Sequence, residues 1–274
     1  MTAMAAAYFA PATVAEATRL LGHAERPTVL GGGTLTMPRA AAEGLAVLDL
    51  TTIPALRGIT TSADETLIGA TTSYADLLAT PVAPPLLRRI AAGITGGPQI
   101  RNQGTIGGSA CCANPASDIP AGLVALGATM IVASETGTRR VPARGFFRGP
   151  FAPDLRPDEI LTHISVPAGR GGQSWGYVKL KHGESSWPLA VTAACISAGI
   201  SVTIGAATSV PTTLRLPPGT LTIPREQLIG LLRELLDDAH WWSDELADAA
   251  YRATVAPVIA YRALAQARTE GIPA

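Results

Sequence analysis

Gly104-Thr105-Ile106-Gly107-Gly108-Ser109 is the stretch of sequence that most restricts the fold of this chain. Glycine permits positive φ and lets amide N–H groups approach one point, and the threonine and serine hydroxyls add neutral donors. A second cluster, Leu30-Gly31-Gly32-Gly33-Thr34, lies far upstream. Two such segments, distant in the sequence, predict a diphosphate held by main chain from two sides. Asp118, a short way downstream, is a candidate partner for a ribose hydroxyl.

The surroundings of the upstream cluster exclude a Rossmann fold. Short apolar strands are expected at residues 27–30 and 46–50, and the interval between them is too short for the long helix of a dinucleotide-binding βαβ unit. The spacing is not Gly-x-Gly-x-x-Gly, and no acidic residue follows a second strand at the expected position. The cluster is therefore predicted to belong to a different nucleotide-binding fold.

Composition restricts the class of partner. Of 274 residues, 47% are hydrophobic and 15% charged, which is ample for a packed core. Lys plus Arg equals Asp plus Glu at 21 each, and this zero net charge argues against nucleic acid and against an anionic membrane. The start of the chain lacks the charged and apolar regions of a signal peptide, and no run of about 18 apolar residues predicts a membrane span. We expect a cytoplasmic protein.

The three cysteines predict neither disulfides nor a metal site. Cys111 and Cys112 are adjacent, and Cys195 is the third. An odd count with one adjacent pair is a poor disulfide framework, and no Cys or His spacing fits zinc or an iron–sulfur cluster. Small buried side chains are the expected role.

Secondary-structure signals divide the chain near residue 170. Before it, strands dominate, with a helix expected at 14–21 behind the N-cap Thr13, and Asp118 is a candidate N-cap for a helix starting at residue 119. Residues 168–173 have the composition of a linker. After it, strands precede helices, which are expected at residues 225–237, 243–249 and 257–269.

The glycine segments belong to a longer series of motifs, which includes Pro115-Ala116-Ser117-Asp118 and residues 144–149, 158–162, 177–179 and 261–264. In order and spacing, along nearly the whole chain, this series resembles the FAD-binding subunit of molybdenum hydroxylases. That family includes the medium subunits of carbon monoxide dehydrogenase and bacterial xanthine dehydrogenase. The resemblance implies an oxidoreductase subunit.

The resemblance also implies a fold and a domain organisation. The fold class is α+β, with a PCMH-type FAD-binding fold of two α+β subdomains and a smaller α+β C-terminal domain. The FAD-binding domain would span residues 1–168, with subdomains at about 1–54 and 55–168. The C-terminal domain would span residues 175–274.

Cofactors and partners follow from the same resemblance. FAD would bind to this chain, a small partner subunit would carry two [2Fe–2S] clusters, and a large one would carry the molybdopterin cofactor. The complex would be a dimer of heterotrimers, in which electrons leave the substrate at molybdenum, pass the clusters and reach FAD and then an external acceptor. This chain would supply binding, orientation and electronic tuning, with no catalytic residue and no metal ligand of its own.

Particular residues take roles by position in the resemblance. The first pyrophosphate segment would comprise Val29, Leu30, Gly31, Gly32, Gly33, Thr34 and Leu35, and the second Thr105, Gly107, Gly108 and Ser109. Asp118 would bind a hydroxyl of the ribose or the ribityl chain, and Lys179 would lie near the flavin or its phosphate. Ile160 or Leu161 would line the adenine or flavin pocket. Thr95 would lie at the isoalloxazine entrance, and Cys112 close to the cofactor without a redox role.

Two departures from the family pattern keep other functions open. Gly33 stands where many relatives have a polar side chain, often His. Ser109 stands where many relatives have Asn. Either change could alter FAD affinity. One alternative is a stand-alone flavoprotein oxidoreductase of the same fold, and another is an assembly module without flavin. An absorption spectrum of the purified protein distinguishes the flavin-free module from the other two.

Overall fold

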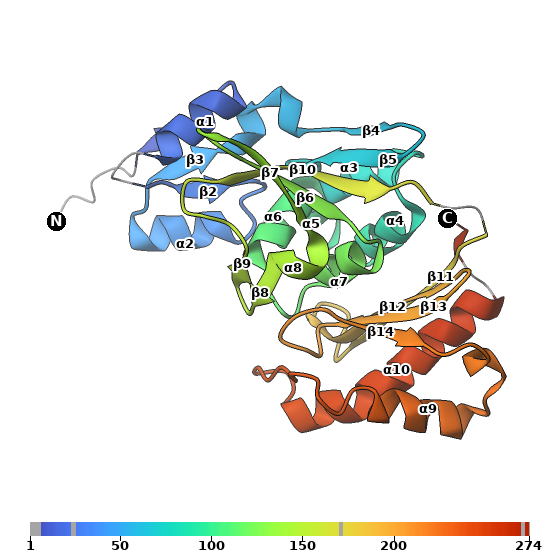
Figure 1. Ribbon diagram of the computed structural model, residues 1–274. Helices are drawn as coiled ribbons and strands as arrows, with labels where there is room; N and C mark the ends of the chain where they lie inside the picture. The colour runs from blue at the N-terminus through green and yellow to red at the C-terminus, as the bar shows by residue number, and fades with distance from the viewer. Residues whose placement is uncertain (1–6, 23–25, 170–171, 270–271, 274) are drawn as a thin grey trace.

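The structure is a computed structural model that describes residues 7–22, 26–169, 172–269 and 272–273. Its elements form layers (Figure 1). A small sheet lies at one end, a five-stranded sheet covers a group of helices, and a second five-stranded sheet lies below those helices. Two long helices cover the outer face of that second sheet. The structure thus mixes sheets and helices as the α+β prediction requires.

The small sheet is parallel, with strand order β1-β3-β2. Its elements and flanking helices are β1 (Tyr8–Phe9), α1 (Val14–Leu21), β2 (Thr28–Leu30), α2 (Thr36–Glu43) and β3 (Val47–Asp49). The helix expected at residues 14–21 is confirmed, since the Thr13 hydroxyl accepts a hydrogen bond from the amide of Glu16 at 3.1 Å. The first glycine cluster occupies the connection between β2 and α2.

The first five-stranded sheet is antiparallel, with order β4-β5-β10-β6-β7. Two 3-10 turns lead into it, and a two-stranded ribbon follows β7. The bounds are η1 (Leu50–Thr52), η2 (Pro54–Leu56), β4 (Ile59–Thr61), β5 (Glu65–Gly69), β6 (Thr129–Ser134), β7 (Gly137–Pro142), α8 (Ala143–Phe146), β8 (Phe147–Gly149), β9 (Ala152–Pro153) and β10 (Ile160–Pro167).

A group of helices lies between the two larger sheets (Figure 1). They are α3 (Tyr74–Ala79), α4 (Pro85–Ala92), α5 (Gly97–Gln103), α6 (Ile106–Cys112) and α7 (Asp118–Ala125). The buried side chains of α3, α4, α6 and α7 join those of both sheets in one hydrophobic cluster, from Ile68 on β5 to Val191 beyond residue 170. The two parts of the chain therefore share one continuous core.

The second five-stranded sheet has the order β14-β13-β12-β11-β15. Its elements and covering helices are β11 (Ser174–Lys181), β12 (Pro188–Ile196), β13 (Ile200–Gly205), β14 (Thr212–Leu216), η3 (Thr220–Thr222), α9 (Arg225–Glu234), α10 (Ala249–Thr269) and β15 (Ile272–Pro273). Glycines permit close packing on both faces. A Cβ at Gly176 would lie 1.9 Å from the carbonyl oxygen of Ala263 in α10, and one at Gly205 would lie 2.6 Å from the Cβ of Ala121 in α7.

Three local expectations were wrong. Residues 243–248 are not helical, because Asp244 instead accepts hydrogen bonds from the amides of Leu246 and Ala247. The helix expected to begin at residue 257 begins at Ala249 instead, since α10 runs continuously through Pro257. Asp118 is the first helical residue of α7, and Ser117 occupies the N-cap. The second glycine cluster begins a helix, since Gly107 and Gly108 lie in the first turn of α6.

Among the residues that the structure describes, no helix combines the length and apolar character that crossing a bilayer would require.

Candidate functional site

The two glycine segments lie directly against each other. A Cβ built at Gly31 would lie 2.8 Å from Thr105 Oγ1 and 3.8 Å from Gly108 Cα. A Cβ at Gly32 would lie 1.8 Å from the carbonyl oxygen of Gln103, a contact that no side chain tolerates. The structure therefore brings together the segments that the sequence predicted to act on one ligand, and the contact explains why glycine is required at residue 32.

The first segment presents a row of free amides. Across the described residues, no hydrogen bond of the protein uses the N–H groups of Gly31, Gly32, Gly33, Thr34 or Leu35. Gly33 has φ +73°, a conformation that favours glycine, and its carbonyl accepts the amide of Met37 as α2 begins. Successive unpaired N–H groups in a turn form a concave site for an anion.

The second segment differs, because its amides are already engaged. The N–H of Ile106 bonds to Thr72, that of Gly107 to Ala70, and that of Ser109 to Thr105, all through backbone carbonyls. The amide of Gly108 donates to Thr105 Oγ1 at 3.0 Å. The two segments therefore contribute unequally: the first offers amides, and the second offers close approach of main chain and the half-buried hydroxyl of Ser109.

A buried tyrosine supports the second segment from behind. The Tyr74 hydroxyl is hydrogen-bonded to Ser109 Oγ, and the Tyr74 amide donates to the Gly104 carbonyl at 3.1 Å. The Tyr74 side chain is buried, and burial raises the pKa of its phenol well above the usual range. Sequence reasoning did not identify Tyr74, because its partner Ser109 lies 35 residues further along the chain.

Asp118 and Lys179, predicted separately as ligand residues, form an ion pair. Lys179 Nζ lies 2.9 Å from Asp118 Oδ2, and the Tyr177 hydroxyl donates to Asp118 Oδ1 at 2.5 Å. Burial, then the nearby Asp118 carboxylate, raises the pKa of Tyr177 well above its usual value, so the phenol stays protonated as the donor. Tyr177 and Lys179 share one face of β11 because they are two residues apart. That spacing was the signal that could have indicated Tyr177.

Thr95 lies beside this group. Lys179 Nζ also donates to the carbonyl of Gly93 at 2.9 Å, and the Thr95 hydroxyl donates to the carbonyl of Ser186 at 3.1 Å. The turn after α4 is thereby held against the turn after β11. The structure thus places Thr95, Asp118 and Lys179 in one neighbourhood.

The other predicted residues are less closely associated with this group. Ile160 and Leu161 are buried and face opposite sides of β10, Ile160 toward the cluster around Leu48 and Leu161 toward the helices. Leu35 is half exposed at the start of α2. Cys112 is half-buried at the end of α6, and burial raises the pKa of its thiol, which disfavours the reactive thiolate.

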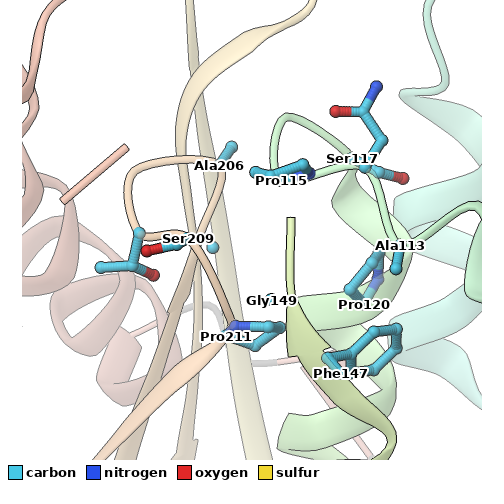
Figure 2. A pocket seen from close by; sticks show the side chains of 12 residues that line it. Ala113, Pro115, Ser117, Pro120, Phe147, Gly149, Ala206, Ser209 and Pro211 are labelled. Atoms are coloured by element: carbon cyan, nitrogen blue, oxygen red, sulfur yellow. The ribbon is translucent and has the colours of Figure 1, made fainter. Parts of the chain in front are cut away.

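A small cleft lies between the start of α7 and the β13–β14 connection (Figure 2). Pro115 and Ser117 of the α6–α7 connection, with Pro120 of α7, face Ser209 and Pro211 of the β13–β14 connection across it. The space inside it amounts to about 10 Å³, roughly what a single water molecule needs. It is therefore too small for a dinucleotide. No group of three acidic, histidine or cysteine side chains in the described chain is placed to hold a metal ion.

Residues 3–169 match the family described as the FAD binding domain in molybdopterin dehydrogenase. The carbon monoxide dehydrogenase medium chain of Hydrogenophaga pseudoflava is 37% identical over 190 residues, covering 67% of this chain and 66% of that protein. The chain belongs to the FAD-binding medium subunits of the molybdenum hydroxylases. The glyceraldehyde dehydrogenase medium chain of Sulfolobus acidocaldarius is 35% identical over 195 residues, 69% of each protein. These alignments span about two thirds of the relatives' length.

A solved structure extends the similarity of this medium subunit to its whole length. The H. pseudoflava carbon monoxide dehydrogenase lacking the Mo-pyranopterin moiety superposes with a TM-score of 0.87 at 30% identity, covering 99% of this chain and 100% of that one. The C-terminal layer of β11–β15, α9 and α10 is therefore part of the shared fold.

The residues present in this medium subunit fit an FAD pyrophosphate. The free amides of residues 31–35 are suitable donors for phosphate oxygens, and the missing side chains at Gly31 and Gly32 keep the main chain within reach. Polar groups that suit hydroxyls of a sugar or ribityl chain lie at Asp118 and Lys179.

Proposed function

We propose that this chain is the FAD-binding electron-transfer subunit of a molybdenum-containing hydroxylase or dehydrogenase. It would receive electrons from the [2Fe–2S] clusters of one partner subunit and deliver them to an external acceptor. The observation that carries the proposal is the contact between residues 31–33 and 104–109, with the free amides of the first segment at their junction. Membership of the family supports the choice of FAD over other nucleotides.

Each group of residues would hold one part of the cofactor. The amides of Gly31, Gly32, Gly33, Thr34 and Leu35 would bind the pyrophosphate, with Val29 and Leu30 placing the segment at the end of β2. Thr105, Gly107, Gly108 and Ser109 would form the opposite wall. A carboxylate oxygen accepts more than one hydrogen bond, so Asp118 keeps acceptor capacity for a ribose or ribityl hydroxyl beside its bonds to Tyr177 and Lys179.

The remaining predicted residues would surround the ring systems. Thr95 would lie at the isoalloxazine entrance, and Ile160 or Leu161 would border the adenine or flavin from β10. Lys179 would place positive charge near the flavin, where a cation favours a reduced anion. Cys112 would lie close to the cofactor without redox chemistry. FAD, when bound, supplies the redox chemistry, and the protein binds and orients it.

The domain limits and the assembly are parts of the same proposal. We propose an FAD-binding domain at residues 1–168, with subdomains at about 1–54 and 55–168, and a C-terminal domain at residues 175–274. The partners would be an iron–sulfur subunit and a molybdopterin subunit, assembled with this chain as a dimer of heterotrimers. The names of relatives such as the carbon monoxide dehydrogenase medium chain support multi-subunit assembly.

The test measures the flavin content of the protein and identifies the subunits that co-purify with it. The chain is purified with any partner subunits that accompany it, and its absorption spectrum is recorded before and after addition of FAD. A yellow protein that releases FAD on denaturation and co-purifies with iron–sulfur and molybdopterin subunits supports the proposal. A colourless protein that takes up no added FAD contradicts it. Turnover by the flavin-loaded chain without partners would favour a stand-alone flavoprotein instead.

A further inference from the structure

Tyr74 is a buried residue at the start of α3 that contacts the second glycine segment. Its amide donates to Gly104, and a Cβ at Gly104 would lie 2.8 Å from its ring carbon Cε2, so the ring packs directly on the second glycine segment. The hydroxyl at the end of that ring has one hydrogen bond in the described structure, to Ser109 Oγ. Tyr74 therefore fixes the segment at both of its ends.

Hydrogen-bond satisfaction decides which hydroxyl is the donor. If Ser109 donated, the phenol proton of Tyr74 would be buried without an acceptor among the described residues, and a buried donor left unpaired is costly. If Tyr74 donates, its buried phenol is satisfied and the proton of Ser109 is free. Ser109 is half-buried and adjoins Gly108, which is exposed, so that proton can face the outside of the segment.

Ser109 belongs to the segment that meets the free amides of residues 31–35. A neutral hydroxyl donor there would add to those amides. We propose that Tyr74 is a positioning residue that orients the Ser109 hydroxyl as a hydrogen-bond donor to a phosphate oxygen of FAD. The inference rests on the proposed function for the identity of the ligand, but assigns to Tyr74 a role that FAD binding alone does not require.

The two hydroxyls act in series, which makes a double-mutant cycle the appropriate test. Tyr74→Phe keeps the ring and removes the donor, and Ser109→Ala removes the group it orients. We expect either change to weaken FAD binding about fivefold to tenfold, the net worth of one hydrogen bond. The double variant is expected to be no weaker than Ser109→Ala, because groups in one chain of hydrogen bonds are not additive.

The measurement is the dissociation constant of FAD for the flavin-free 274-residue chain, with its melting temperature as a second readout. Tyr251→Phe is the matched control, since Tyr251 is 45% exposed on α10, a helix on the outer face of the second five-stranded sheet. A purely structural role for Tyr74 would lower the melting temperature and leave the dissociation constant unchanged. Ser109→Thr, which keeps a hydroxyl, should retain more affinity than Ser109→Ala.

Two results overturn the inference. One is unchanged FAD affinity in folded Tyr74→Phe, and the other is additive losses in the double variant. Both leave the proposed function standing, because the unsubstituted chain still binds FAD. If the unsubstituted chain takes up no FAD, the proposed function and this inference fail together.

Discussion

Lys179 and Asp118 form a buried ion pair between β11 and the first turn of α7, with Nζ 2.9 Å from Oδ2. The two side chains are only 10% and 3% exposed. The pair connects the sheet that follows residue 170 to α7, the helix that comes directly after the one carrying Gly107 and Gly108. One carboxylate thus has two proposed roles, as an interdomain contact and as a ligand for a cofactor hydroxyl.

Lys179→Met is expected to lower the free energy of unfolding by about 3 kcal/mol, because it leaves a buried carboxylate without its countercharge. Urea denaturation of the flavin-free protein measures this. Asp118→Asn combined with Lys179→Met should restore part of the loss, since the unpaired charge is then removed.

Lys181→Met is the control for that prediction. Lys181 lies on the same strand and donates to the carbonyl of Glu184, with no carboxylate partner in the described part of the chain. We expect its substitution to change stability by no more than about 0.5 kcal/mol. Equal losses in the two variants would show that the ion pair contributes nothing beyond the lysine side chain.

Gly32→Ala is expected to abolish FAD uptake. Its Cβ would lie 1.8 Å from the carbonyl oxygen of Gln103, so the two glycine segments must separate. The flavin-to-protein absorbance ratio after incubation with FAD measures the effect. Gly230→Ala in α9 is the control: its Cβ would have open space, and alanine should stabilise that helix by up to about 1 kcal/mol. Normal FAD content in Gly32→Ala would contradict the proposed pyrophosphate site.

The sequence predicted the two-sided ligand site because its signal is local. Runs of glycine with hydroxyl residues mark main chain that must approach something closely, and the structure confirms that residues 31–33 and 104–109 approach each other. The helix at 14–21 was predictable for a similar reason, since Thr13 and Glu16 occur at capping distance. In both cases the residues that give the signal are neighbours in the chain, although the two glycine segments themselves lie far apart in the sequence.

Features that depend on distant residues were not predictable. The Tyr74 hydroxyl meets Ser109 across the α3–α6 contact, and nothing near residue 74 indicates that partner. The expected helix at 243–249 failed because Asp244 is engaged by Arg252 and by the amides of Leu246 and Ala247. Those amides and that guanidinium favour a turn, which overrides helix propensity.

Glu159 is expected to make stability depend on pH at the acid end. Hydrogen bonds from Arg139 hold the pKa of Glu159 below the usual 4.5, so the folded state favours the ionised carboxylate. The contribution of ionised Glu159 to the free energy of unfolding is therefore complete above about pH 4.5. It is lost as the pH falls through the lower pKa that Glu159 has in the folded state. Unfolding free energy measured between pH 6 and 3 should fall less steeply in Glu159→Gln. Glu43→Gln, at an exposed pair with Arg39, should keep the slope of the unsubstituted chain.

Arg252 is expected to be the most important single charge for the stability of the C-terminal sheet. It is fully buried, donates to Asp244 Oδ1 at 2.6 Å, and also donates to the carbonyls of Leu189 and Ala206, the latter in a residue with φ +56°. Arg252→Met should lower the free energy of unfolding by about 3–5 kcal/mol, because a carboxylate and two carbonyls lose their donor.

Arg262→Met, exposed on the same helix, should have little effect. Since Arg252 contacts neither glycine segment, the folded fraction should bind FAD normally, and urea denaturation with a parallel FAD titration separates the two effects. Normal stability in Arg252→Met, or weakened FAD binding by the folded protein, would contradict this assignment.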